Sequence, residues 1–297
     1  MRHAVLGAGG VGGLLAAALA RSGQDVVLLM RAESLPRYPG QLQIDSAVLG
    51  SFTIEVRAAP QLDHRVDALW VTTKATGLDE SLQAAPATTV ADAMVIPMLN
   101  GLDHVATLRQ TYQHVSAAAI QVETERTSPG HIRQLSAFLR AELAPASSSP
   151  QSLGAAERAA ASLTTAGIPT IVRDDELAVL WDKFAFLAPL ALATTALDAP
   201  LGAVRNDPRF LGCQDEVLHL AALDGASTDP ATVRELVDAA PDHMRSSMQK
   251  DVEQGRTPEL DAIAGAILRR ATRYEHAVPA TRALTVLIQN RLNPTSP

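Results

Sequence analysis

The stretch VLGAGGVGG, residues 5–13, decides the fold, because its five glycines stand between two apolar segments. Residues 2–6 predict a buried strand, and Leu14 to Arg21 predict a helix. The spacing between them is GxGxxG, in which the first glycine permits a tight turn, the second lets the backbone approach a pyrophosphate and the third lets the helix pack closely. The helix N-terminus adds unpaired N–H groups and partial positive charge. We therefore expect the turn to bind a dinucleotide through Gly7, Ala8, Gly9, Gly10, Val11 and Gly12.

A secretory leader is the alternative interpretation of this N-terminus. Met1-Arg2-His3 is weakly basic, an apolar run follows, and Ala18-Leu19-Ala20 resembles a small-residue cleavage site. A leader core is a continuous apolar helix, whereas five glycines interrupt this one. We therefore expect a folded turn and not a leader.

The next predicted strand, residues 25–30, bears on the choice of cofactor. Folds that bind NAD usually place an acidic residue about 20 residues beyond the glycines, where it holds the ribose 2′-hydroxyl. Here the strand ends in Met30-Arg31. A guanidinium offers a planar set of donors to a 2′-phosphate, so Arg31 favours NADP. Two alternatives stay open: Arg31 as a solvated surface residue, and Glu33 as the partner of a ribose.

Composition limits the classes of function. The chain has 297 residues, enough for two domains, a net charge of −7 and one cysteine, Cys213. The charge and the lack of a basic cluster argue against a nucleic acid or an anionic membrane as partner. One cysteine excludes an internal disulfide framework and fits a reducing cytoplasm. The sequence has no CxxC, HExxH, GxSxG or P-loop motif, so we expect no metal, and hydrolase and kinase interpretations lack an anchor.

The first half of the chain alternates between strand-like and helix-like segments, as in a parallel sheet covered by helices. Residues 41–59, with Gly50 between two β-rich runs, predict an inserted hairpin. Residues 144–150, rich in Ser and Pro, predict a loop before a helix at 152–166. The predicted strands are residues 2–6, 25–30, 67–72, 94–99, 115–122 and 168–173.

From Asp174 onward helical periodicity replaces this alternation and continues to residue 292. The predicted fold class is therefore α/β. It comprises an N-terminal Rossmann-like domain with a mostly parallel sheet, residues 1–173, and an all-helical C-terminal domain, residues 174–297.

Two loops should project from the carboxyl ends of strands, where ligands bind in such sheets. One is Val71-Thr72-Thr73-Lys74, whose hydroxyls and ammonium suit a phosphate or a ribose. The other is Met98-Leu99-Asn100-Gly101, with a carboxamide at a sharp turn. Lys74 could equally be a solvated loop residue, and Asn100 could merely tolerate a left-handed turn.

The helical half begins with an apolar segment, Leu177 to Leu197, interrupted by Asp182, Lys183 and Pro189. The charged pair lies inside the run, which argues against a membrane span and for a buried helix. Adjacent residues on a helix point in different directions, so Asp182 does not neutralise Lys183. A lysine on an apolar helix has a partner or a function, unless its ammonium reaches solvent.

Two further segments of this half carry polar candidates. Ser246-Ser247-Met248 precedes Asp251, which could simply pair with Arg256. Glu259 follows Pro258 in the first turn of a predicted helix, where the helix dipole favours a negative charge whatever its function.

Together these segments resemble the ketopantoate reductase (2-dehydropantoate 2-reductase) family over nearly the whole chain and in matching order. The segments that carry the resemblance are GAGGVGG, Met30-Arg31, Val71-Thr72-Thr73-Lys74-Ala75, Asn100-Gly101-Leu102, Trp181-Asp182-Lys183, Ser246-Ser247-Met248 with Asp251, and Glu259-Leu260-Asp261.

The resemblance implies that the N-terminal domain binds NADPH, with Arg31 at the 2′-phosphate and with Thr73, Lys74 and Asn100 close to the cofactor. It implies a 2-oxo acid substrate, with Asn100 also close to it, in a cleft between the domains. It further implies a place in pantothenate biosynthesis.

The same resemblance implies that Lys183 is the catalytic lysine, that Glu259 helps to hold the substrate and that Ser247 contacts the substrate carboxylate. These roles agree with the chemistry of the side chains. Hydride transfer to a ketone leaves negative charge on oxygen, and an ammonium can stabilise that charge and donate the proton. A nearby carboxylate helps to keep the lysine protonated and can accept a hydrogen bond from a substrate hydroxyl, so Lys183 and Glu259 are the expected catalytic residues.

The sequence departs from the family at the expected substrate wall. The family commonly has asparagines four and eight residues after the lysine, whereas this chain has Leu187 and Ala191. The asparagine often found after the glutamate is also missing from Ile263-Ala264-Gly265. A pocket with fewer amides recognises fewer oxygens, so we expect a less polar 2-oxo acid than ketopantoate.

Two other classes of protein stay open. One is a dehydrogenase of similar build, such as an imine reductase or a 2-hydroxy-acid, opine or polyol-phosphate dehydrogenase. The other is a catalytically silent NADP-binding regulator. In any of these cases the helical half, rich in Ala and Leu, could pair with a second copy of the chain.

Overall fold

The computed structural model describes residues 1–147 and 149–293, and it divides into two compact units. The first comprises Met1–Leu99 and His104–Val179, and the second comprises Asn100–Asp103 and the chain from Leu180 onward. The predicted boundary after residue 173 falls just before the helix that begins at Glu176, and the two units divide inside that helix. The tetrapeptide Asn100–Asp103 packs with the helical unit, although both of its chain neighbours belong to the first unit.

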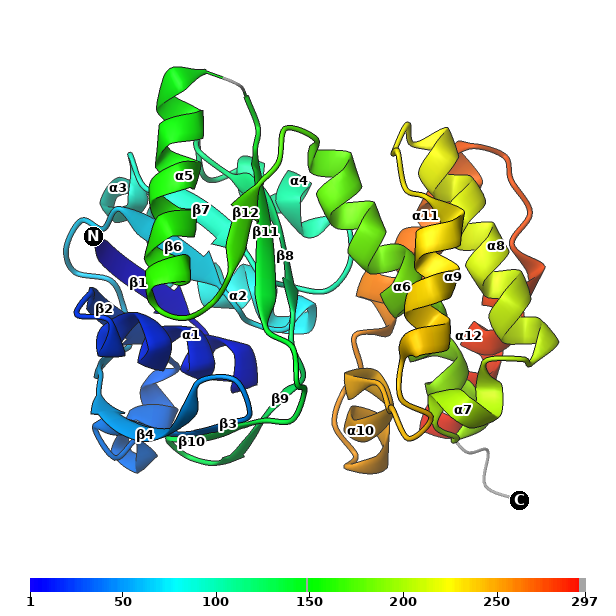
Figure 1. The fold of residues 1–297 in the computed structure, drawn as a ribbon, viewed down its shortest axis with the longest axis horizontal. Coiled ribbons are helices and arrows are strands. Elements are labelled where there is room, and N and C mark those ends of the chain that lie inside the picture. Colours follow the sequence, from blue (N-terminus) through cyan, green and yellow to red (C-terminus); the bar gives the residue numbers. More distant parts are fainter. Residues whose placement is uncertain (148, 294–297) are drawn as a thin grey trace. The chain divides into compact units, whose positions relative to one another are not determined.

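A parallel five-stranded sheet forms the centre of the first unit (Figure 1). Its strand order is β5-β2-β1-β6-β7, and every neighbouring pair is parallel. This confirms the predicted Rossmann-like sheet. The strands are β1 (Arg2–Leu6), β2 (Asp25–Leu29), β5 (Arg57–Ala59), β6 (Ala68–Val71) and β7 (Met94–Pro97).

The register of this sheet aligns the carboxyl ends of its strands. Leu6 pairs with Leu29 on one side and with Val71 on the other, and Val71 pairs with Pro97. The loops after β1, β2, β6 and β7 therefore leave the sheet at one edge. In open parallel sheets this is the edge at which ligands bind.

The later predicted strands do not continue the parallel sheet. β8 (Ser116–Gln121) pairs antiparallel with β11 (Arg140–Pro145), and β11 pairs parallel with β12 (Thr170–Val172). They form a separate three-stranded sheet, linked to the first by a single bridge between Val95 and Val115. The expectation that segments 115–122 and 168–173 belong to one alternating βα series is therefore wrong.

The predicted hairpin is present as β3 (Gln41–Ser46) and β4 (Gly50–Glu55), whereas β5 leaves it to join the central sheet. The hairpin extends into a four-stranded sheet with order β4-β3-β10-β9, through β9 (Thr124–Ser128) and β10 (His131–Gln134). The sequence did not predict β9, β10 or β11. The residues of β9 and β10 are mostly polar and β9 is largely exposed, so no apolar pattern marks these two strands. The sequence of β11, RAELAP, does alternate polar and apolar residues at its start, and we overlooked this pattern.

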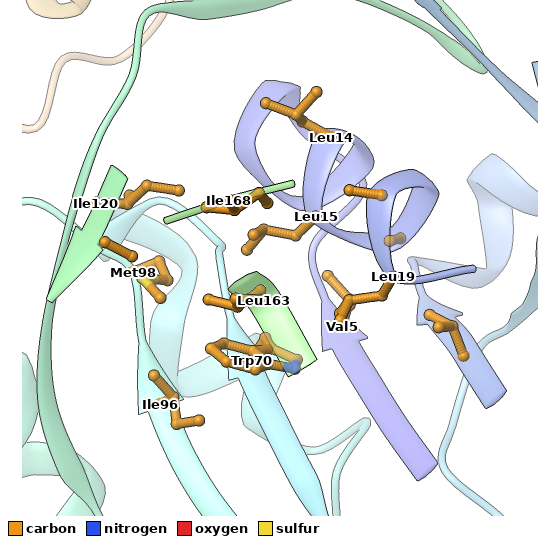
Figure 2. Close-up of a cluster of buried hydrophobic side chains, with 14 of the residues drawn as sticks. Val5, Leu14, Leu15, Leu19, Trp70, Ile96, Met98, Ile120, Leu163 and Ile168 are labelled. Atoms are coloured by element: carbon orange, nitrogen blue, oxygen red, sulfur yellow. The ribbon is translucent and has the colours of Figure 1, made fainter. Parts of the chain in front are cut away.

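The core of the first unit lies between the central sheet and its helices, chiefly α1 (Gly10–Arg21) and α5 (Pro150–Thr165) (Figure 2). Leu15 and Leu19 of α1 pack with Trp70 of β6 and Leu163 of α5. Ser149 caps α5 by accepting a hydrogen bond from the Ser152 amide. Part of the predicted loop 144–150 belongs to β11, and residue 148 lies outside the described residues. The other helical segments of this unit are η1 (Ala32–Arg37), η2 (Ala75–Gly77), α2 (Leu78–Leu82), α3 (Ala87–Val90) and α4 (His104–Arg109).

The second unit contains helices but no strand among its described residues. Its longest helix, α6 (Glu176–Leu197), could cross a membrane by its length and its apolar composition. However, 67% of the most apolar 18-residue segment of this helix is buried inside the protein. Trp181, Phe184 and Phe210 lie in its core. The other helices are α7 (Leu201–Val204), α8 (Pro208–Leu223), α9 (Pro230–Ala239), α10 (Ser247–Glu253), η3 (Asp261–Gly265), α11 (Ala266–Arg273) and α12 (Pro279–Leu292).

Candidate functional site

The glycine-rich turn after β1 has the geometry that its spacing predicts. Gly7 has a φ of 111°, which a residue with a side chain rarely adopts. A Cβ atom on Gly12 would lie 1.9 Å from the carbonyl oxygen of Gly7, so only glycine lets α1 start this close to β1. The hydroxyl of Thr72 lies 2.9 Å from the same oxygen and fixes the turn to the end of β6.

The start of α1 is open toward a ligand. A Cβ on Gly9 would meet nothing within 4 Å, and Gly9 caps the helix without a side-chain hydrogen bond. The first N–H groups of α1 can therefore donate hydrogen bonds to an anion, and the backbone at Gly9 leaves room for that anion. These features fit a dinucleotide pyrophosphate at the stretch from Gly7 to Gly12, which includes Ala8 and Val11.

Gly10 and Gly13 have to be glycines for a different reason, because the β9–β10 hairpin packs against them. A Cβ on Gly10 would lie 2.6 Å from the Thr124 hydroxyl, and one on Gly13 would lie 2.6 Å from Ile132. Both contacts are made by the β9–β10 hairpin, which packs on α1. Its exposed Arg126 donates a hydrogen bond of 3.2 Å from Nη1 to the Ala8 carbonyl. The sequence analysis missed Arg126, because only this hairpin brings it to the turn.

Arg31 and Lys74 follow the two strands that flank β1. Arg31 is exposed at the start of η1, and its Nη2 lies 3.8 Å from the position of a Cβ on Gly77, in the turn that follows Lys74. Among the described residues nothing pairs with the Arg31 guanidinium. Lys74 is exposed, and Thr73 accepts a long hydrogen bond, 3.4 Å, from Ser81. Glu33, the alternative partner of a ribose, lies in the first turn of η1.

Asn100 and Glu259 meet within the second unit. The Asn100 amide donates a hydrogen bond of 3.3 Å to Oε2 of Glu259, whose side chain is buried with 7% exposure. Next to it, Gly101 has a φ of 99°, and a Cβ there would lie 2.6 Å from the Ala262 carbonyl oxygen. The loop therefore packs against the π-helical turn η3, a kind of distortion often found at functional sites.

Glu259 lies one position outside the helix in which the sequence placed it. The helical residues begin at Leu260, and the Glu259 carbonyl accepts a hydrogen bond from the Ile263 amide. Its side chain is thus fixed immediately before the helix and turned toward Asn100.

Lys183 is partly buried on α6 in the same unit. Burial lowers the pKa of its ammonium to about 8 from the ordinary 10.5, and the negative charge of Glu259 acts in the opposite direction. Asp182 accepts a hydrogen bond of 2.9 Å from Thr228. The Glu259 carboxylate therefore favours the protonated form of Lys183, and the pKa of this lysine lies closer to neutral pH than that of an ordinary lysine.

The structure also places the other substrate candidates. Ser247 is exposed at the start of α10, whereas its neighbour Ser246 is buried and hydrogen-bonds to Thr194 at 2.8 Å. Leu187 is partly exposed one turn after Lys183. Ala191, with 0% exposure, belongs to the apolar core of the second unit.

Asp251 pairs with Arg256 at 2.8 Å, as the structural alternative for this residue predicted. Among the residues that the structure describes, no group of three or more His, Cys, Asp or Glu side chains could hold a metal ion.

A parallel sheet with a glycine-rich turn at the carboxyl ends of its strands, joined in one chain to a helical unit with a lysine near a carboxylate, is the arrangement expected of a dinucleotide-binding oxidoreductase. Comparison of the sequence with models of known protein families identifies the family within this class. Residues 3–145 match the model of ketopantoate reductase PanE/ApbA, and residues 175–292 match that of its C-terminal domain. The chain belongs to the ketopantoate reductase family.

Individual relatives agree with this assignment. The uncharacterized oxidoreductase YkpB of Bacillus subtilis is 26% identical, and the match covers 97% of this chain and 98% of the relative. The 2-dehydropantoate 2-reductase of Caulobacter vibrioides is 26% identical over 96% of this chain and 97% of its own.

Two functions occur among solved structures with this fold. A PanE/ApbA family ketopantoate reductase from Ralstonia eutropha superposes with a TM-score of 0.86 at 24% identity, covering 99% of both chains. A D-mandelate dehydrogenase, in a ternary structure with NADH and anilino(oxo)acetate, superposes with a TM-score of 0.88 at 21% identity, again covering 99% of both chains.

Proposed function

We propose that this protein is an NADPH-dependent reductase that converts a 2-oxo acid of low polarity into a 2-hydroxy acid. The observation that carries the proposal is the group formed by Lys183, Glu259 and Asn100 in the second unit. It joins a lysine with a pKa of about 8 to a buried carboxylate, and an amide donates to that carboxylate.

We assign the cofactor to the first unit. The glycine turn would hold the pyrophosphate at the start of α1, with Arg126 as an additional cation beside it. Arg31 would pair with the 2′-phosphate of NADPH because its guanidinium is exposed at the end of β2. Thr73 and Lys74 would contact the cofactor from the end of β6. The D-mandelate dehydrogenase was solved with NADH, so the fold alone does not decide the cofactor. In this chain a preference for NADPH would rest on Arg31.

We assign the proton chemistry to Lys183. When bound, reduced nicotinamide supplies a hydride to the carbonyl carbon. The carbonyl π electrons then move to oxygen, and the Lys183 ammonium stabilises the new charge and transfers one proton to it. Lys183 regains a proton from solvent, and Glu259 favours that reprotonation.

We assign substrate recognition to Ser247, Asn100 and Leu187 of the second unit. Ser247 offers an exposed hydroxyl to the substrate carboxylate, and Asn100 offers its amide near the carbonyl. Leu187 presents an apolar side chain one turn from Lys183, where an asparagine would recognise a substrate hydroxyl. This favours an unhydroxylated 2-oxo acid over ketopantoate. A role in pantothenate biosynthesis, a cytoplasmic location and pairing with a second copy through the helical unit stay predictions.

The experiment that tests the function is a panel of carbonyl compounds, comprising ketopantoate, branched and aromatic 2-oxo acids, imines and polyol-phosphate precursors, with NADPH oxidation as the signal. The proposal expects turnover with unhydroxylated 2-oxo acids and identification of the 2-hydroxy acid by mass spectrometry. Turnover only of imines would identify a different dehydrogenase. NADPH binding without any turnover would identify a silent regulator, and either result would overturn the proposal.

A further inference from the structure

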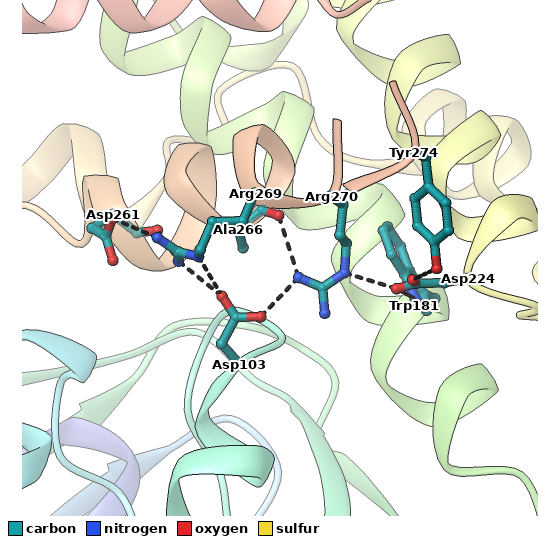
Figure 3. Close-up of polar contacts among 8 residues, drawn as sticks. All are labelled: Asp103, Trp181, Asp224, Asp261, Ala266, Arg269, Arg270 and Tyr274. Carbon is teal, nitrogen blue, oxygen red and sulfur yellow. Dashed lines mark hydrogen bonds and ion pairs between the residues drawn. The ribbon is translucent and has the colours of Figure 1, made fainter. Parts of the chain in front are cut away.

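Each of three segments that carry candidate active-site residues also carries one member of a single polar network (Figure 3). Asp103 lies three residues after Asn100, Asp261 lies two after Glu259, and Trp181 lies two before Lys183. We call this set the Asp103 network. It comprises Asp103, Arg269, Arg270, Asp224, Asp261, Trp181 and Tyr274, all of the second unit.

Asp103 is the branching point of the network. Its Oδ1 accepts a hydrogen bond of 2.7 Å from Nη1 of Arg270, and its Oδ2 accepts one of 2.9 Å from Nε of Arg269. Arg269 also donates to the Asp261 carboxylate at 2.8 Å and to the Asp261 carbonyl at 3.1 Å. One branch therefore ties the Asn100 loop to the turn that follows Glu259.

The second branch leads from Asp103 to α6. Nε of Arg270 donates to Oδ2 of Asp224 at 2.7 Å, and the Trp181 indole donates to the same oxygen at 3.2 Å. The Tyr274 hydroxyl donates to Oδ1 of Asp224. This branch ties the Asn100 loop to the turn of α6 from which Lys183 projects.

The centre of this branch is shielded from water. The side chains of Arg270 and Asp224 are only 17% and 8% exposed. Burial alone would raise the pKa of Asp103, but the hydrogen bonds and charges of Arg270 and Arg269 outweigh it and hold that pKa below its usual range. Ion pairs of this kind hold their geometry better than exposed ones, because water and salt screen them less.

The loop itself has little freedom to adjust. Gly101 packs against the Ala262 carbonyl, and Leu102 is buried in the apolar core. With Asp103 held by two arginines, the backbone next to Asn100 is fixed, and its amide faces Glu259.

We propose that Asp103 is a positioning residue for the reduction, one that holds Asn100 against Glu259 and couples both to the Lys183 turn of α6. The inference rests on the proposed function of the site. Loss of the Asp103 charge frees the Asn100 loop and weakens its hold on Glu259. The environment of the Lys183 ammonium then changes, so the pH dependence of turnover shifts in addition to its size.

The test compares Asp103→Asn and Asp103→Glu with the wild type. Asp215→Asn, which breaks the exposed Asp215–Arg234 pair on the same unit, is the matched control. For Asp103→Asn we expect kcat to fall about tenfold or more. We also expect the upper pH limb of kcat to move and the Kd for NADPH, by titration calorimetry, to stay within about twofold of the wild type. Asp103→Glu should recover part of kcat and return the limb toward the wild-type position, whereas Asp215→Asn should change neither.

A second readout is independent of turnover. The chain has two tryptophans, and each indole N–H gives its own signal in an 15N NMR spectrum. Asp103→Asn should shift the Trp181 signal and leave that of Trp70, which donates to His3 in the first unit, in place. A variant with wild-type kcat and pH profile would overturn the inference, as would one whose loss of kcat comes without a pH shift or a Trp181 shift. Absence of turnover in the wild type would instead refute the proposed function.

Discussion

Replacing Lys183 with Met should make the protein more stable and nearly inactive. Met keeps the length of the side chain and removes the charge. Because burial holds the pKa of Lys183 at about 8 in the folded state, against an ordinary 10.5, the charged form is disfavoured by folding. The difference corresponds to about 3 kcal/mol, at about 1.4 kcal/mol for each pH unit. Glu259 loses its counter-charge in the variant, so the expected net gain at pH 7 is about 1 to 3 kcal/mol.

The sign of the pH dependence follows from the direction of this pKa shift. Below about pH 8 the folded and unfolded states both hold the Lys183 proton, and the wild type bears the full cost. Between about 8 and 10.5 only the unfolded state stays protonated, so the cost falls as pH rises. The stability advantage of Lys183→Met should therefore shrink by about 2 kcal/mol between pH 7 and about pH 9.5.

The assay is urea unfolding of both proteins at these two pH values, with turnover measured on the best substrate. Lys250→Met, on α10, is the control for replacing a lysine of the same unit by methionine. We expect Lys183→Met to lower kcat by about a hundredfold or more, the usual scale for a lost proton donor. A variant that is less stable by the same amount at both pH values, or one that keeps near-normal turnover, would refute the reasoning.

Three further predictions use the same protein. Arg31→Ala should weaken NADPH binding by about 1.5 to 3 kcal/mol and leave NADH binding unchanged, whereas Arg126→Ala should weaken the binding of both cofactors equally. If calorimetry shows that the wild type binds NADPH and NADH with equal affinity, the role of Arg31 is contradicted. Turnover should fall as pH rises through about 8. Glu259→Gln should move the midpoint of this fall to lower pH, because the variant lacks the charge that raises the pKa of Lys183. An unmoved midpoint in the pH-rate profile would exclude an effect of Glu259 on the pKa of Lys183. In the wild type, kcat/KM for ketopantoate should be below that for a branched unhydroxylated 2-oxo acid, and Leu187→Asn should raise the ratio; a falling ratio would show that other residues bind the hydroxyl.

The substrate prediction uses Leu187 alone for a structural reason. Ala191, which the sequence pairs with Leu187 on one helical face, is completely buried in the apolar core. An asparagine there would have to bury its amide among apolar side chains, so Ala191→Asn would test stability before it tested specificity.

Local spacing was enough to predict the glycine-rich turn and the parallel sheet around it, but not the other two sheets of the first unit. The GxGxxG turn, the strand before it and the Arg31 position depend on residues close in sequence, and the structure has the turn where the spacing predicts it. The β9–β10 hairpin escaped prediction because its polar residues carry no period, and with it the sequence missed the constraint on Gly10 and the position of Arg126.

The Asp103 network could not be predicted from the sequence for another reason. Asp103 and Arg270 lie 167 residues apart, and an Asp after a turn and an Arg pair on a helix are each ordinary features of a surface. Only the placement of Asn100–Asp103 with the helical unit reveals the pairing. By contrast, Lys183 stood out in sequence because a charge inside an apolar helix is unusual.

In the proposed reaction this chain transfers a hydride to the carbonyl carbon of a 2-oxo acid, and Lys183 supplies the proton. The most direct test is a reaction with NADPH carrying deuterium at the transferred position of the nicotinamide, followed by mass spectrometry of the product. The wild type should give a 2-hydroxy acid with one deuterium at C2, and Lys183→Met should give almost no product. An unlabelled hydroxy acid, or equal product from both proteins, would contradict the proposed reaction.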